Sequence, residues 1–188
     1  MQRVPQRIEV RSDPTHNHPV QVVLGLGGNL GDPLRALVEA RARISGWAVV
    51  LAASRVLRTA PVGPVEQPPF VNAALLIDAG CGPCELLGRC QELEAAAGRD
   101  RSREARWGPR ALDIDLLVAR DVVHRGPLLE LPHPRFHERA FALVPAAEVA
   151  GEWRHPLLGR TLAALAADAL RADPAAVAAV LADGRWRP

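Results

Sequence analysis

The chain has 188 residues, of which 48% are hydrophobic and 23% charged, as in an ordinary globular domain with a self-sufficient core. Its formal net charge of +2 gives no reason to expect a polyanionic partner such as nucleic acid. All 23 basic side chains are arginine, which excludes a P-loop because that motif needs a lysine.

Segments that would point to a membrane or to secretion are not visible. The longest apolar runs, such as residues 48–53, are far too short to cross a bilayer, and the charged N-terminus lacks an apolar signal segment. We therefore expect a cytoplasmic protein that does not bind membranes. Cys81-x-x-Cys84 could be half of a zinc site or a redox pair, but no second Cys/His pair follows at zinc-site spacing, so we expect packing thiols.

The first part of the chain combines an irregular segment with a strand and a helix. Residues 1–19 are polar, contain proline and lack periodicity, and we expect a mobile N-terminal extension. A buried strand over 20–26 leads into a glycine-rich turn. Asp32 followed by Pro33 predicts the N-cap and first residue of a helix.

The central part continues with two strands, a helix and a strand. Apolar patterns predict strands over 48–56 and 70–77, and Pro83 opens a second helix. An arginine-rich loop over 98–110 leads into a fourth strand over 111–118. The order is βαββαβ, which predicts an α+β fold, a ferredoxin-like sandwich with additional C-terminal helices.

Helical patterns dominate the rest of the chain, over 137–147, 161–170 and 174–181. We expect one domain over 20–159 and a helical C-terminal extension over 160–188. This alanine-rich extension could pack on the domain, mediate dimerisation or trail free, and a monomer is expected.

The fourth strand carries two carboxylates, Asp113 and Asp115. Side chains alternate along a strand, so both point to one face, about 7 Å apart. Adjacent carboxylates repel unless a positive group lies between them, and Mg²⁺ commonly joins carboxylates to substrate phosphates. A solvated strand face is the alternative. The opposite, apolar face is expected to hold Leu112, Ile114, Leu116 and Val118.

Arginines crowd the loop before this strand, at Arg99, Arg101, Arg103, Arg106 and Arg110. Guanidinium groups bind phosphate in a bidentate manner and neutralise the charge of a transferring phosphoryl group. For Arg103 and Arg106 a solvated basic surface is the simpler interpretation. Acidic metal ligands directly after an arginine-rich loop favour phosphoryl transfer.

These motifs resemble the 6-hydroxymethyl-7,8-dihydropterin pyrophosphokinase family, transferases of folate biosynthesis. The resemblance rests on RWGPRALDIDL (106–116), LGLGGNLGD (24–32), RTAPVGP with QP and FVNA (58–64, 67–68, 70–73), and LPHPR with HERAF (131–135, 137–141). It implies transfer of pyrophosphate from ATP to the pterin hydroxymethyl group, with two Mg²⁺ ions. The sequence departs from relatives at Gly28, where serine is more usual, and at Pro134.

The resemblance also implies a role for particular residues. Catalysis would use Arg99, Arg110, Asp113 and Asp115, the two aspartates as metal ligands. ATP would contact Gln91, Glu94, Arg101, Arg110, Leu116, His133 and Arg139. The pterin would contact Thr59, Val62, Phe70, Asn72, Trp107 and Phe141. Taken singly, Phe70 and Phe141 could be plain core residues, and His133 could belong to a rigid turn.

Two other interpretations stay open. An RNA-binding domain of the RRM type shares the βαββαβ order, but the expected central strands are aliphatic and the two aspartates would repel a phosphate backbone. A relative that keeps the fold without the activity is the second, although its acids and arginines are intact.

Overall fold

The computed structural model describes residues 19–61, 63–99, 108–177, 179–181 and 186. Its helices are α1 (Pro33–Ile44), α2 (Pro83–Ala96), α3 (Ala140–Ala150) and α4 (Leu162–Ala172), with a 3-10 turn, η1 (Phe136–Glu138). The strands are β1 (Gln21–Gly28), β2 (Val49–Ala53), β3 (Val56–Thr59), β4 (Phe70–Asp78), β5 (Asp113–Ala119), β6 (His124–Arg125), β7 (Glu130–Leu131) and β8 (Ala179–Leu181).

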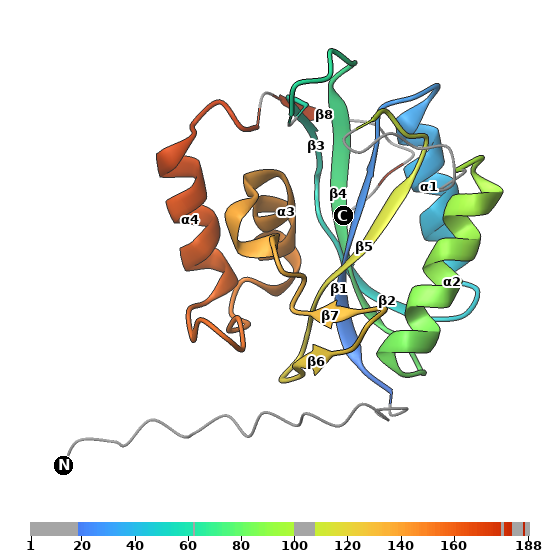
Figure 1. The fold of residues 1–188 in the computed structure, drawn as a ribbon, viewed down its shortest axis with the longest axis vertical. Coiled ribbons are helices and arrows are strands. Elements are labelled where there is room, and N and C mark those ends of the chain that lie inside the picture. Colours follow the sequence, from blue (N-terminus) through green and yellow to red (C-terminus); the bar gives the residue numbers. More distant parts are fainter. Residues whose placement is uncertain (1–18, 62, 100–107, 178, 182–185, 187–188) are drawn as a thin grey trace.

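An antiparallel sheet forms the centre of this α+β fold. Its strand order is β5-β1-β4-β3-β8, and β2 also pairs with β4. Helices α1 and α2 cover one face, whereas α3 and α4 lie on the other (Figure 1). Strand β1 therefore runs through the middle of a three-layer molecule, and it is buried along most of its length.

Alternation along β1 divides the core in two. Val22, Leu24 and Leu26 pack with the residues of α1 and α2, whereas Val23 packs with the residues of α3 and α4. Because strand side chains alternate between faces, Gly25 and Gly27 share the second face with Val23. These two glycines leave that face of the central strand without side chains where it meets the candidate site.

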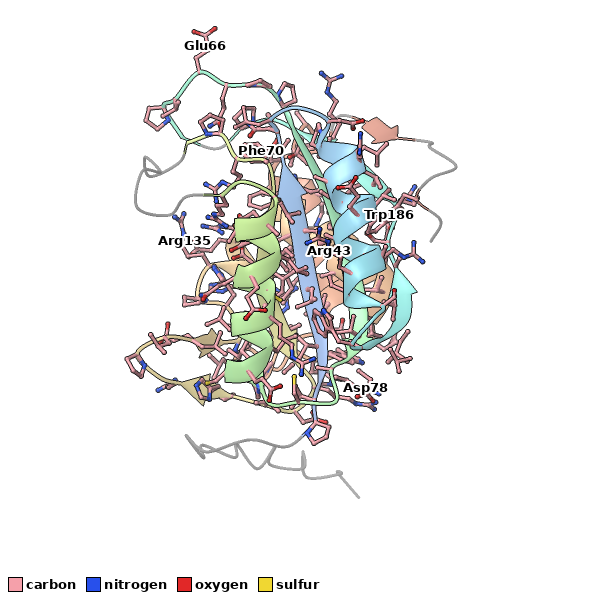
Figure 2. The ribbon with its side chains drawn as sticks, turned by 90° about the vertical axis from the view of Figure 1, so that its right-hand side faces the viewer. Arg43, Glu66, Phe70, Asp78, Arg135 and Trp186 are labelled. Atoms are coloured by element: carbon pink, nitrogen blue, oxygen red, sulfur yellow. The ribbon has the colours of Figure 1, made fainter. Side chains whose placement is uncertain are left out.

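Both predicted helix starts in the first half of the chain are confirmed. The Asp32 side chain accepts a hydrogen bond from the N–H of Arg35 at 3.0 Å, and Pro33 is the first residue of α1. Helix α2 begins at Pro83, as expected. Figure 2 shows the two helices side by side over the sheet. Asp32, Pro33 and Pro83 could be recognised because each acts on the start of its own helix.

Three strand and helix predictions need correction. The expected strand over 48–56 is two strands, β2 and β3, which both pair with β4 but are separated by an interruption of the pairing at Ser54 and Arg55. The Ser54 hydroxyl accepts a hydrogen bond from the N–H of Ala74 at 2.8 Å there. Helix α3 begins at Ala140, after η1, and not at residue 137. The expected helix over 174–181 is wrong, since 179–181 form β8, antiparallel to β3.

The predicted face of Val118 is also wrong. Ile114 and Leu116 pack toward α1 and α2, but Leu117 and Val118 both pack toward α3 and α4. The pairing of β1 with β5 shifts register between Val23 and Leu24, so an extra residue is accommodated there. This irregularity reverses the alternation just beyond the two aspartates.

In the C-terminal part, the described residues pack on the domain. Thr161 caps α4, accepting a hydrogen bond from the N–H of Ala164 at 3.2 Å, as the predicted helix over 161–170 requires. Leu162 and Leu165 of α4 belong to the core shared with α3. None of the helices in the described ranges is long and apolar enough to span a membrane.

Candidate active site

Three neighbouring strands bring polar side chains and glycines into register. Asp113 of β5 pairs with Gly27 of β1, which pairs with Asn72 of β4. Directly opposed residues of antiparallel strands point to the same face. Asp113 and Asn72 therefore flank a glycine, with their backbones two strand spacings or about 10 Å apart. A second row places Asp115 beside Gly25.

The glycines keep the space between these rows open. A β-carbon at Gly27 would lie 2.6 Å from Oδ1 of Asn72, closer than atoms can approach. One at Gly25 would lie 3.0 Å from Cδ1 of Leu117. Any larger residue at position 27 would push the Asn72 side chain aside. The backbone of β1 at Gly25 and Gly27 thus forms the floor of a pocket.

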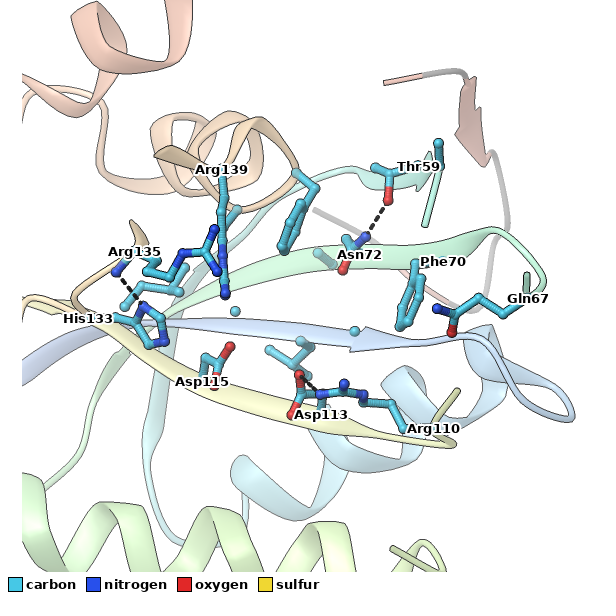
Figure 3. A pocket seen from close by; sticks show the side chains of 18 of the residues that line it. Thr59, Gln67, Phe70, Asn72, Arg110, Asp113, Asp115, His133, Arg135 and Arg139 are labelled. Carbon is cyan, nitrogen blue, oxygen red and sulfur yellow. Dashed lines mark hydrogen bonds and ion pairs between the residues drawn. The ribbon is translucent and has the colours of Figure 1, made fainter. Parts of the chain in front are cut away.

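The pocket above this floor has a volume of about 630 Å³ (Figure 3). Asp113 and Asp115 lie along one wall on β5, and Thr59 with Asn72 lies on the opposite side. The lining residues are Gly25, Leu26, Gly27, Thr59, Ala60, Gln67, Phe70, Asn72, Ala73, Arg99, Arg110, Asp113, Asp115, Leu117, His133, Pro134, Arg135, Arg139, Phe141 and Ala142. A pocket of this size accommodates a nucleotide-sized or smaller ligand.

The electrostatics of Asp115 show how much negative charge the pocket concentrates. Burial of its carboxyl group and the neighbouring charge of Asp113 raise the pKa of Asp115 to about 7. Arg139 and Arg110 act in the opposite direction, but more weakly than burial does. The carboxyl group is thus poised to gain stability from an added cation, because a cation would favour its ionised form.

Asp113 is held by two arginines. The guanidinium of Arg99 donates to Oδ1 of Asp113, and that of Arg110 donates to Oδ2 at 2.9 Å. Arg99 also donates to Oε1 of Glu94 at 2.5 Å, and the same oxygen accepts the N–H of Ile114 at 2.8 Å. Glu94, only 1% exposed, therefore lies beneath the site and anchors both Arg99 and β5.

Two cationic or titratable side chains come from the segment after β7. Burial and the charge of Arg139 lower the pKa of His133, whose Nδ1 accepts the N–H of Arg135 at 3.2 Å. Burial also lowers the pKa of Arg139, although Asp115 counteracts it. The Arg139 guanidinium lies 5.7 Å from the ring centroid of Phe141, close enough for a cation–π contact. This segment supplies the positive charge that faces Asp115.

The opposite side of the pocket is polar at its base and aromatic along its wall. Nδ2 of Asn72 donates to Oγ1 of Thr59 at 2.8 Å, and both side chains are buried. This bond fixes the orientation of the amide. Phe70 and Phe141 both line the same pocket, from β4 and α3. An orientated amide next to two rings suits a flat heterocycle with hydrogen-bonding edges.

Sequence reasoning missed Asn29 as a site residue. It is 5% exposed, and its Oδ1 accepts the N–H of Arg110 at 2.9 Å. Its Nδ2 donates to Oε1 of Gln67 and to the carbonyl of Pro68, each at 3.0 Å. Asn29 thus joins the loop before β4 to the segment before β5. The available signal was an amide inside an otherwise apolar, glycine-rich turn.

A second hollow of about 390 Å³ lies next to the first, between α2 and the β6–β7 hairpin. Asp115, His133 and Pro134 line both spaces, so the two are contiguous at these residues. Three of the residues assigned to ATP line this second hollow, namely Gln91, Leu116 and His133. Its apolar lining also includes Leu87, Leu128 and Leu129.

The predicted site residues are thus mostly brought together. The main pocket is lined by Arg99, Arg110, Asp113, Asp115, Thr59, Phe70, Asn72, His133, Arg139 and Phe141. Glu94 lines neither space and lies beneath them. Val62, Arg101 and Trp107 fall outside the described residues. Cys81, Cys84 and Cys90 are free thiols, and the described part of the chain holds no cluster of three or more metal-ligating side chains.

Comparison with known proteins agrees with this geometry. The family model of the 7,8-dihydro-6-hydroxymethylpterin-pyrophosphokinases matches residues 23–151. The chain is 47% identical over 130 residues to the 2-amino-4-hydroxy-6-hydroxymethyldihydropteridine pyrophosphokinase of Methylorubrum extorquens, covering 68% of this chain and 80% of that protein. It is 43% identical over 135 residues to the enzyme of that name from Mycobacterium tuberculosis, covering 66% and 70%.

A solved structure supports the same fold. The chain superposes on Plasmodium falciparum HPPK-DHPS crystallised with pteroate with a TM-score of 0.65 at 13% identity, covering 82% of this chain and 45% of that one. The chain thus spans less than half of that longer protein, and at this identity the similarity concerns the fold. The matched family model and the relatives show that this chain belongs to the 7,8-dihydro-6-hydroxymethylpterin-pyrophosphokinase family.

Proposed function

We propose that this chain transfers a pyrophosphoryl group from ATP to the hydroxymethyl group of 6-hydroxymethyl-7,8-dihydropterin, a step of folate biosynthesis. The observation that carries the proposal is the row formed by Asp113, Gly27 and Asn72 across three strands. It places an acidic, arginine-rich strand two strand spacings, about 10 Å between backbones, from the strand that carries an orientated amide. The strand between them presents only glycine to the pocket at this row. The family's substrates need these two environments within one pocket.

The acceptor would lie on the Thr59 and Asn72 side. The carboxamide of Asn72 offers a donor and an acceptor to a pterin edge, although its Nδ2 already bonds Oγ1 of Thr59. Phe70 and Phe141 line the same space and would contact the faces of the ring. By family resemblance, Val62 and Trp107 would also contact the pterin.

Asp113 and Asp115 would hold two Mg²⁺ ions. The donor set fits, because Mg²⁺ in nucleotide sites is usually bound by one or two carboxylates together with substrate phosphates. Burial and the charge of Asp113 raise the pKa of Asp115 to about 7, so a bound cation would favour its ionised, metal-binding form. Once bound, such ions supply charge neutralisation for the phosphates and Lewis acidity at the transferring group.

The arginines would act on the phosphates. Arg99 and Arg110 are paired with Asp113 in the structure, and phosphate oxygens offer them stronger bidentate partners. We therefore expect both guanidinium groups to transfer from the carboxylate to the polyphosphate when ATP binds. Arg139 faces Asp115 from the other wall. By family resemblance, Arg101 would also contact ATP.

The adenine end of ATP would occupy the hollow between α2 and the β6–β7 hairpin. Gln91, Leu116 and His133 line this hollow, and it meets the main pocket at Asp115. An adenosine bound there would direct its phosphates toward the aspartates. Glu94 is buried beneath, so its proposed contribution to ATP binding acts through Arg99.

The reaction then needs positioning more than covalent participation by the protein. The acceptor hydroxyl oxygen forms a bond to the β-phosphorus of ATP, the bond from that phosphorus to the oxygen of the α-phosphate breaks, and AMP leaves with both bonding electrons. The hydroxyl proton passes to solvent. Holding both reactants in line removes much of the entropic barrier, and arginine charge stabilises the developing anion.

The proposal also includes the type of fold, the oligomeric state and the cellular location. The strand order β5-β1-β4, followed by β2 and β3 together, supports a ferredoxin-like core to which α3, α4 and β8 are added. The exposed large apolar residues among the described ones form only single residues or pairs, which favours a monomer. The formal net charge of +2 favours a protein without a nucleic-acid partner. Dependence on ATP favours a cytoplasmic location.

Product analysis tests this function. Purified protein is incubated with ATP and Mg²⁺, with and without 6-hydroxymethyl-7,8-dihydropterin, and the nucleotides are separated. We expect AMP and a pterin diphosphate in equal amounts, only when the pterin is present. Formation of ADP would mean transfer of a single phosphoryl group, and absence of turnover by folded protein would contradict the proposal.

A further inference from the structure

The C-terminal end of the chain lies against the sheet near the acceptor side of the pocket. Strand β8 pairs with β3, with Ala179 opposite Arg58, the neighbour of Thr59. Trp186 is 5% exposed and belongs to the core between the sheet and helices α1 and α2. Both features lie beyond residues 23–151, which the family model matches. The family match therefore gives no role to either feature.

Trp186 is hydrogen-bonded at Ser54, in the interruption between β2 and β3. Its indole Nε1 donates to the carbonyl of Ser54 at 2.7 Å, and the guanidinium of Arg41 on α1 lies 5.2 Å from its ring centroid. Figure 2 shows Trp186 beside α1. A buried carbonyl that loses its donor costs considerable free energy, so Trp186 stabilises this junction.

The same junction is held from the opposite face of the sheet. The backbone N–H of Arg55 donates to Oε2 of Glu148 on α3 at 2.8 Å, and the Arg55 guanidinium donates to Oε1 at 2.6 Å. Ser54 is also bonded to β4, since its N–H donates to the carbonyl of Ala74 at 2.9 Å. The start of β3 is thus fixed from both faces by contacts distant in sequence.

Strand β3 connects this junction to the pocket. It contains only four residues and ends at Thr59, whose hydroxyl accepts the hydrogen bond that orientates Asn72. Strand β3 pairs with β4 along one edge, and among the described strands its other edge pairs with β8. A short strand that becomes an unpaired edge opens more readily, because fewer hydrogen bonds must break.

We propose that the C-terminal segment positions the acceptor side of the active site, with β8 and Trp186 holding β3 so that Thr59 and Asn72 are pre-organised for the pterin. This inference rests on the proposed function. Trp186 is a positioning residue that acts through Ser54 and β3. The segment lies on the acceptor side, so acceptor binding depends on it more than ATP binding does.

The test compares Trp186→Phe, which keeps an aromatic ring but removes the indole donor, with a chain ending at Asp173. Trp47→Phe is the matched control, since Trp47 contacts Arg89 of α2 instead. We expect the KM for the pterin to rise about three- to tenfold in Trp186→Phe, the factor that the loss of one hydrogen bond produces. The rise should be larger in the shortened chain, with the KM for ATP within about twofold in both.

Hydrogen–deuterium exchange supplies a readout that does not depend on activity. Peptides covering 56–59 should exchange faster in both variants than in the parent chain, whereas peptides covering 113–119 should be unchanged. Equal rises in both KM values, or unchanged exchange over 56–59 in Trp186→Phe, would overturn the inference. If the parent chain made no AMP, the proposed function would fail, and the exchange measurement would still decide whether the C-terminal segment orders β3.

Discussion

The side-chain oxygen of Asn29 accepts a hydrogen bond from the backbone N–H of Arg110 at 2.9 Å, while its nitrogen donates to Gln67 and Pro68. One buried amide therefore connects the segment that carries Arg110 to the loop on the proposed acceptor side. The backbone completes the link, since the N–H of Asn29 donates to the carbonyl of Arg110 at 2.9 Å. The two halves of the proposed site are mechanically coupled through this residue.

Replacement of Asn29 should accordingly impair both halves. In Asn29→Ala the buried N–H of Arg110 loses its acceptor, which costs about 1–3 kcal/mol, so we expect kcat/KM to fall about tenfold or more. Asn29→Asp keeps the acceptor but loses the donor, and should mainly raise the KM for the pterin. Steady-state kinetics of both variants checks this. Wild-type kinetics in Asn29→Ala would show that the bridge has no catalytic consequence.

Substitutions of Glu94 and of Gln91 should change different kinetic constants, although the family resemblance assigns both residues to ATP. Glu94→Gln keeps an acceptor for the N–H of Ile114 but removes the charge next to Arg99. We expect a lower kcat and a lower melting temperature with little change in the KM for ATP. Gln91→Ala alters the second hollow, so it should raise the KM for ATP and leave the fold intact. The opposite pattern would place Glu94 in direct contact with nucleotide.

Stability should depend on pH through His155. It is 2% exposed, and both ring nitrogens are buried without a hydrogen-bond partner among the described residues. Burial and, secondarily, His137 lower the pKa of His155 to about 4 from 6.5. The unfolded chain therefore binds more protons between these values, so the contribution of neutral His155 is complete above pH 6.5 and is lost as the pH falls toward 4.

Urea unfolding at several pH values measures this dependence, with His155→Phe as the comparison because a phenyl ring preserves stacking on Phe136. Between pH 6.5 and 4 the parent chain should lose on the order of 1–2 kcal/mol more than the variant, allowing for screening by water. Parallel pH profiles for the two proteins would refute the assignment.

The thiols should differ in reactivity. Cys84 is exposed, whereas Cys81 and Cys90 are buried, and burial raises the pKa of Cys90 to about 12. Because the thiolate is the reactive species, a thiol reagent should label Cys84 rapidly in the native protein and the other two only after unfolding. Cys84→Ser should abolish the fast phase. Rapid labelling of all three thiols in the native chain would contradict the described packing.

Several features around the site could be predicted because they depend only on residues that are neighbours in sequence. The alternation that turns Asp113 and Asp115 away from Ile114 is a property of any strand, and Pro33 and Pro83 act on their own helices. Sequence reasoning failed where tertiary contacts decide. The alanine-rich stretch ending at Leu181 has a helical propensity, which pairing with β3 overrides. The burial of Glu94 beneath the pocket, bonded to Arg99 and to the N–H of Ile114, also depends on tertiary contacts that the sequence does not reveal.

The central claim is that Asp113 and Asp115 hold the Mg²⁺ ions required for pyrophosphoryl transfer. The most direct test is the rate of pterin-dependent AMP formation as a function of Mg²⁺ concentration. It should be measured in the parent chain, in Asp113→Asn, in Asp115→Asn and in Asp78→Asn. Asp78 is the control, since it lies at the end of β4 remote from Phe70 (Figure 2).

We predict a rate that rises with Mg²⁺ in the parent chain and in Asp78→Asn, and that is at least about 100-fold lower in the two active-site variants. Circular dichroism spectra should be unchanged in all four proteins. A folded Asp115→Asn variant that forms AMP at the parental rate, with the parental Mg²⁺ dependence, would contradict the account.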